Sequence, residues 1–348
     1  MKSGLKKIGQ SLFSFCFIIM IIGSGHLFMI TIEHFDMKIS VQEYAHPGRK
    51  GGWHGDVSQR VELQKMIDKR VASGKENELE IFQKALPSLD KDDGFDFNML
   101  PVSAFLVMCT LLSSMLALLL LVFSRFTKNN VMQTLMGILA GFCAWFTVEL
   151  GLTMAARQLG VAKRFDIYNS MIIGTRGEFV LLKYSWVFLV PVLFYLLFQE
   201  SVRCNMFIFL RRQFYLMRGA VATGRIDNYA PRVAFFFSSA VWFFYVVLLL
   251  AFNERIFGAT SWFTFLVFFI CFSCSGYLCY RLLKQASFGA NLRYAIGVAL
   301  VFWTDIEILE KWGAMKGPWL TYQPHTVVIF ITALLLGGFM IVRETRRS

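Results

Sequence analysis

The chain has 348 residues, of which 56% are hydrophobic and 17% are charged, and its formal net charge is +12. Soluble domains carry about a quarter charged residues, whereas apolar runs of roughly 20 residues, enough to cross a bilayer core of about 30 Å, recur along this chain. This composition excludes an ordinary soluble domain. A transmembrane barrel is also excluded, because the sequence lacks the alternating strands of about ten residues that barrels need. We therefore predict an all-α fold, a polytopic membrane helix bundle.

The apolar runs predict about eight spans, with both termini cytoplasmic, at residues 12–32, 99–123, 131–156, 179–198, 233–252, 262–282, 294–312 and 326–342. Lysines before the first span and arginines after the last support this orientation by the positive-inside rule. The fourth span is expected to kink at Pro191. The seventh is the weakest, because only about ten apolar residues precede Asp305.

These spans divide the chain into five parts. They are the N-terminus and first span (1–33), an external loop (34–98), spans two to four (99–199), a basic cytoplasmic segment (200–232), and spans five to eight with the C-terminus (233–348). The external loop is expected to hold two short helices, at 59–71 and 78–86. Two short helices bury too little surface for a core of their own. We therefore expect the loop to lie on the spans or on a partner protein.

The basic segment 200–232 orients the predicted bundle. It contains six arginines but only Glu200 and Asp227 as acidic residues, so it is expected on the cytoplasmic side. Phe207, Leu210 and Phe214 lie on one helical stripe, which favours a helix along the inner membrane surface, although a helix buried among others is also compatible. The candidate membrane-surface residues, which would contact anionic lipid headgroups, are Arg211, Arg212, Arg218 and Arg225. Topology and lipid contact account for most of the basic excess, and no direct nucleic-acid binding is expected.

Ionisable side chains inside spans are costly and often mark a function. The candidates here are Glu149, Lys183, Asp305 and Glu307, all in the outer half of the predicted bundle. Glu307 could pair with Lys311 one turn away, and Glu149 could pair with Lys183 across two helices. Such residues can link helices or partner subunits, or they can form an ion or proton path. The sequence leaves both interpretations open.

The histidines and cysteines indicate no metal site or cofactor. His26 alone lies inside a predicted span, with His34 and His325 at the outer edge, so a haem or quinol site remains only an alternative. His46 and His54 are interpreted as exposed loop residues. Cys271 and Cys274 have redox spacing but no second pair, which favours small apolar core residues. No nucleotide-binding, esterase or metalloprotease motif is present.

Three stretches carry a resemblance to a known family. They are Ile32-Glu-His-Phe-Asp-Met37, the Arg211-Arg212 pair, and Thr223-Gly-Arg-Ile-Asp-Asn-Tyr229 just before a span. Across about residues 11–284, these features loosely resemble an uncharacterised family of inner-membrane proteins of integrating conjugative elements. The resemblance implies a bacterial inner-membrane location and a role in conjugation or type IV secretion. It implies no catalytic residues.

Together these observations predict a non-enzymatic inner-membrane subunit of a multiprotein assembly, with the lipid bilayer and other membrane proteins as its partners. Two alternatives stay open. One is an ion- or proton-coupled transporter that uses the carboxylates of the outer half. The other is a membrane redox subunit with a quinol or haem site near His26 and His325.

Overall fold

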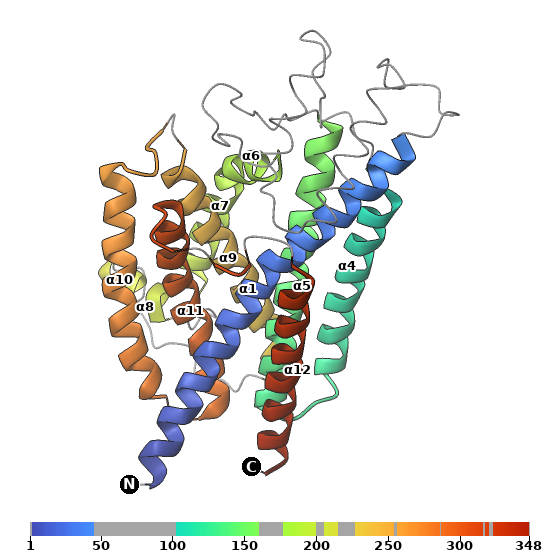
Figure 1. Cartoon of the computed structure of the whole chain (residues 1–348). Helices are drawn as coiled ribbons and strands as arrows, with labels where there is room; N and C mark the ends of the chain where they lie inside the picture. The colour runs from blue at the N-terminus through green and yellow to red at the C-terminus, as the bar shows by residue number, and fades with distance from the viewer. Residues whose placement is uncertain are drawn as a thin grey trace.

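The computed structural model describes residues 2–44, 102–159, 177–199, 205–214, 227–253, 256–285, 287–315, 317–319 and 323–347. Every regular element in these ranges is an α-helix, as predicted. The helices run back and forth along one axis, and the two ends of the chain lie at the same end of the bundle (Figure 1). The all-α polytopic membrane bundle is thereby confirmed. The expected helices at 59–71 and 78–86 fall outside the described residues.

Six of the described helices are long and apolar enough to cross a membrane. They are α1 (Lys2–Tyr44, with its apolar part at Lys7–Ile32), α4 (Ala104–Ser124), α5 (Asn130–Gln158), α9 (Ala230–Ala251), α10 (Trp262–Leu283) and α12 (Pro324–Arg347). Each corresponds to one predicted span. Serine caps fix the starts of α4 and α10, where Ser103 Oγ accepts a hydrogen bond from Leu106 N at 3.1 Å and Ser261 Oγ accepts one from Thr264 N at 3.3 Å.

The first helix continues well beyond its predicted end at Ile32, because α1 extends to Tyr44. A polar contact ties this extension to the next helix. The buried carboxylate of Asp36 accepts a hydrogen bond from Ser103, the same side chain that caps α4. One serine therefore both starts α4 and fixes it beside α1.

The predicted seventh span is the helix α11 (Phe288–Lys311), which lies in the middle of the bundle against α1, α5, α9 and α10. Its 24 residues extend about 36 Å at the usual helical rise. The consecutive residues 303–306 are all buried, so this part of the helix is covered on every side. The helix looks weakly apolar in the sequence because neighbouring helices, rather than lipid, surround it.

The predicted fourth span is not continuous. It consists of α6 (Gly177–Tyr184) and α7 (Trp186–Phe198), and the interruption lies at Ser185, whereas Pro191 lies inside α7. Ser185 Oγ donates to Leu182 O at 2.6 Å and accepts from Trp242 Nε1 at 2.6 Å, which fixes the turn against α9. With 13 residues, α7 extends only about 20 Å and is too short to cross a bilayer core by itself.

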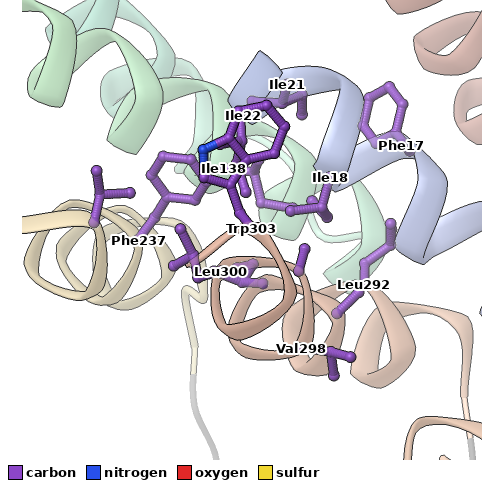
Figure 2. Close-up of a cluster of buried hydrophobic side chains, with 14 of the residues drawn as sticks. Phe17, Ile18, Ile21, Ile22, Ile138, Phe237, Leu292, Val298, Leu300 and Trp303 are labelled. Atoms are coloured by element: carbon purple, nitrogen blue, oxygen red, sulfur yellow. The ribbon is translucent and has the colours of Figure 1, made fainter. Parts of the chain in front are cut away.

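An apolar cluster fills the space between α1, α5, α9 and α11 (Figure 2). Its buried members include Phe17, Ile18, Ile21, Ile138, Phe237, Leu292, Val298 and Leu300. Trp303 on α11 belongs to the same cluster. His26 follows Ile22 of this cluster by four residues on α1, and Glu307 follows Trp303 by four residues on α11, so each lies about one turn from a cluster member.

Two glycines bring α5 and α9 into close contact. A Cβ on Gly137 would lie 2.7 Å from Ala230 O, and one on Gly141 would lie 2.8 Å from Ala234 O. Small residues four positions apart thus face each other on both helices, an arrangement that allows membrane helices to approach closely. Ser238 Oγ also donates across this contact to Gly141 O at 2.9 Å.

Candidate functional site

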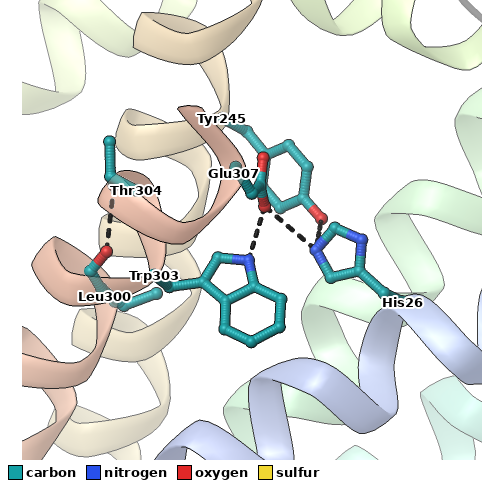
Figure 3. A network of polar contacts seen from close by, with 6 residues as sticks. All are labelled: His26, Tyr245, Leu300, Trp303, Thr304 and Glu307. Carbon is teal, nitrogen blue, oxygen red and sulfur yellow. Dashed lines mark hydrogen bonds and ion pairs between the residues drawn. The ribbon is translucent and has the colours of Figure 1, made fainter. Parts of the chain in front are cut away.

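The most concentrated polar site in the described residues is formed by His26, Tyr245, Trp303 and Glu307 (Figure 3). His26 comes from α1, Tyr245 from α9, and the other two from α11. Trp303 and Glu307 are four residues apart, so they share one face of α11. We call these four residues the His26–Glu307 network.

Two atoms sit at the centre of the network. His26 Nε2 lies 2.7 Å from Tyr245 Oη and 3.2 Å from Glu307 Oε1. Trp303 Nε1 donates to the same Glu307 Oε1 at 2.5 Å. The indole can only donate, so Glu307 Oε1 must accept. Glu307 Oε1 therefore lies between the indole N–H and the imidazole ring.

Aromatic rings surround the network. The His26 ring lies 5.3 Å from the Trp303 ring and 5.7 Å from the Tyr245 ring, measured between centroids. Trp145 stacks on Tyr245 at 5.6 Å, and Trp319 packs on Trp303 at 4.8 Å. The side chains of His26 and Glu307 remain 20% and 15% exposed. The network is therefore largely enclosed but not sealed.

A second carboxylate lies beside the network. Glu310 follows Glu307 by three residues and is close enough to interact electrostatically with both Glu307 and His26. Its Oε1 is buried beside Gly317 and Trp319, where a Cβ on Gly317 would collide with it. Two carboxylates thus share one imidazole in this part of the bundle.

Asp305 faces a different neighbour. It is 4% exposed, and its Oδ2 accepts a hydrogen bond from Ser275 Oγ on α10 at 3.4 Å. The two predicted candidates on α11 therefore lie in separate contacts, Glu307 against α1 and Asp305 against α10. The sequence suggested that Glu307 pairs with Lys311, but in the structure Glu307 pairs with His26. The exposed Lys311 ammonium lies 5.9 Å from the centre of the Phe252 ring instead.

The predicted Glu149–Lys183 pair is not formed. Glu149 on α5 is buried, whereas the Lys183 ammonium lies 4.7 Å from the ring centre of Tyr184, its own neighbour on α6. The helix α6 ends at Tyr184, and the chain turns at Ser185 directly after it.

A helix lies within the predicted basic segment, but one of its two arginines is buried. In α8 (Asn205–Gln213), the Arg211 side chain is 1% exposed. Its guanidinium donates to Gln199 O at the end of α7 and to Phe207 O. Arg211 is therefore not a membrane-surface residue, since protein carbonyls occupy its donors. Arg212 is exposed, and Arg218 and Arg225 lie outside the described residues.

The remaining candidates do not assemble into a cofactor site. His325 at the start of α12 is exposed, whereas His26 Nε2 faces Tyr245 and Glu307. Cys271 is buried and Cys274 is exposed. Within the described ranges, no three His, Cys, Asp or Glu side chains are grouped so that they could hold a metal ion. The side chains of His34, His46 and His54 fall outside the part of the chain that the structure describes.

Sequence reasoning singled out His26 and Glu307 separately but did not bring them together, and it missed Tyr245. One signal was present: Tyr245 places a phenol hydroxyl inside the apolar run of α9, where a buried hydroxyl needs a partner. The partner comes from α1, which lies 219 residues away in the chain.

The fold and the site define a class, a polytopic α-helical membrane protein with a buried histidine–carboxylate network between α1, α9 and α11. Comparisons with protein-family models, with curated proteins and with solved structures give no match to this chain.

Proposed function

We propose that this protein is a non-enzymatic subunit of a multiprotein assembly in the bacterial inner membrane, and that the assembly is a conjugation or type IV secretion apparatus. The membrane class follows from the fold. The assembly rests on the resemblance carried by residues 32–37, Arg211-Arg212 and 223–229. The subunit role rests on how the central helix is held.

Polar side chains link the central helix α11 to its neighbours near both of its ends, and this is the observation that carries the proposal. The links are Asn291 Nδ2 to Ser11 Oγ on α1 at 2.7 Å, Arg293 Nη1 to Thr134 Oγ1 on α5 at 2.8 Å, Ser275 Oγ on α10 to Asp305 at 3.4 Å, and His26 on α1 to Glu307 at 3.2 Å. Hydrogen bonds between membrane helices each contribute about 0.6–2 kcal/mol.

Such links favour a bundle in which α11 stays fixed relative to its neighbouring helices. In a transporter, one group of helices rocks against another around a central site. Here a hydrogen bond or ion pair joins α11 to α1 near each of its ends, and others join it to α5 and α10. Movement of α11 against any of these neighbours would break at least one buried polar contact. The intramembrane carboxylates therefore serve to hold helices together.

Affinity purification tests the subunit role. The tagged full-length chain, extracted from its native membranes with a mild detergent, is expected to bring other membrane proteins with it. Deletion of residues 59–86 in the external loop should weaken that co-purification while the spans remain inserted. The exposed-face substitution Arg212→Ala serves as the control and should leave the protein partners in place. A fully active, monodisperse monomer without partners would overturn the proposal.

A further inference from the structure

We propose that His26 and Glu307 form a reversible proton-binding site, in which His26 takes up one proton and Glu307 holds the resulting imidazolium. The proposal goes beyond the subunit role and does not depend on it. The ligand of this site is a proton, and the group that binds it is the His26 imidazole.

The geometry around His26 suits proton uptake. Its Nε2 faces the Glu307 carboxylate at 3.2 Å, a favourable contact when that nitrogen carries a proton. Trp303 Nε1 donates to the same carboxylate oxygen and holds Glu307 in place beside the ring. Tyr245 Oη, at 2.7 Å from Nε2, fixes the orientation of the ring. Imidazole is the side chain that changes its charge between about pH 5 and 8.

The charge around the pair also favours uptake of a proton. Glu310 interacts electrostatically with both His26 and Glu307 from the same helix. Other described ionisable groups in this half of the neighbouring helices include Tyr245 on α9, Glu149 on α5, Asp36 on α1, Asp305 and Lys311 on α11, Lys183 on α6 and His325 on α12. Of the basic members, Lys183 lies on the Tyr184 ring, Lys311 is exposed and lies 5.9 Å from the Phe252 ring, and His325 is exposed. An imidazolium at His26 offsets repulsion between two nearby carboxylates.

The His26–Glu307 pair is not sealed from its surroundings. His26 and Glu307 each retain some exposure, 20% and 15%. On the side toward the termini, the apolar cluster of Ile18, Ile21, Val298 and Leu300 lies next along α1 and α11 (Figure 2). The residual exposure of both side chains leaves the pair accessible to a proton, and the apolar cluster borders it along α1 and α11.

The chemical step is a single protonation. A proton from solvent adds to the unprotonated ring nitrogen of neutral His26, and the product is an imidazolium whose Nε2–H donates to the Glu307 carboxylate. No covalent bond between heavy atoms forms or breaks, and no oxidant or reductant takes part. Reversal at higher pH returns the proton to solvent.

Trp303 provides a reporter for the test, because its ring lies 5.3 Å from that of His26 and a protonated imidazole quenches indole fluorescence more than a neutral one. The full-length chain is placed in neutral phosphatidylcholine nanodiscs, and its intrinsic fluorescence is followed from pH 8.5 to 4.5. The wild type should show a one-proton transition that disappears in His26→Gln and in Trp303→Phe. The matched control His325→Gln, which changes an exposed histidine, should keep the transition.

Glu307→Gln supplies the readout that a purely structural contact would not give. It keeps an oxygen for Trp303 to donate to but removes the negative charge, so the midpoint of the transition should move to lower pH by about one unit or more. An unchanged transition in His26→Gln, or an unchanged or raised midpoint in Glu307→Gln, would overturn the proposal. If His26→Gln does not fold, ¹⁵N-histidine NMR of wild type and Glu307→Gln decides in the same way, through the pH at which the buried imidazole signal shifts.

Discussion

Gly137 on α5 lies so close to Ala230 on α9 that a Cβ on the glycine would be 2.7 Å from the alanine carbonyl oxygen. The same hypothetical Cβ would be 2.8 Å from Val233 Cβ. Backbone atoms cannot yield as a flexible side chain can, so any larger residue must push the two helices apart. Gly137 therefore sets the distance between α5 and α9.

Gly137→Ala should lower the stability of the folded bundle by about 1–3 kcal/mol, as is typical of overpacking. Gly151→Ala on the same helix is the matched control, because a Cβ there has no atom within 4 Å. That control should be neutral or slightly stabilising, since alanine favours helix over glycine by up to about 1 kcal/mol. Thermal unfolding in detergent, followed by size-exclusion chromatography, measures both variants. Equal losses at the two positions would show that the close contact is not responsible.

Arg211 and Arg212, although adjacent, should respond in opposite ways. Arg211→Ala leaves the carbonyls of Gln199 and Phe207 without their guanidinium donor, so α8 should loosen from the end of α7 by about 1–3 kcal/mol. Hydrogen exchange of residues 205–213 should then rise. Arg212→Ala should leave exchange unchanged and instead reduce contact with anionic lipid, because its side chain is exposed. Faster exchange in the Arg212 variant alone would reverse this assignment.

The orientation of the bundle in the membrane can be measured with single cysteines in a background that lacks the native ones. Positions Lys75 and Lys163 should react with an impermeant thiol reagent in intact cells, whereas Arg218 and Arg346 should react only after the membrane is opened. The chain ends lie together in the fold (Figure 1), so Arg346 also reports the side of the N-terminus. Labelling of Arg218→Cys in intact cells would invert the whole topology.

Much of the helical layout could be predicted from the sequence, because apolar length and flanking charge act locally. The spans at 131–156 and 262–282, for example, nearly coincide with α5 and α10. The interruption of the fourth span could not be placed this way. Pro191 is the stronger local signal, but the break at Ser185 depends on a hydrogen bond from Trp242, 57 residues further along the chain.

The importance of α11 was hidden for a related reason. Hydropathy measures how well a helix tolerates lipid, and α11 contacts mostly protein, so polar residues such as Asn291 and Asp305 can be accommodated by partners on α1 and α10. The weakest predicted span is thus the most enclosed helix. The His26–Glu307 contact likewise needs α1 docked on α11, which no local pattern encodes. The Gly137–Gly141 spacing was readable in the sequence and indicates close packing.

The double amide variant Asp305→Asn/Glu307→Gln tests most directly whether the buried carboxylates hold the bundle of an assembly subunit together. Both amides keep an oxygen that can accept from Ser275 or Trp303, so the variant should retain normal abundance and its co-purifying partners. The double alanine variant removes these acceptors and should lower the folded yield, since each interhelical contact contributes about 0.6–2 kcal/mol. Partners lost from the amide variant at normal abundance would contradict the structural role and favour an ion-coupled one.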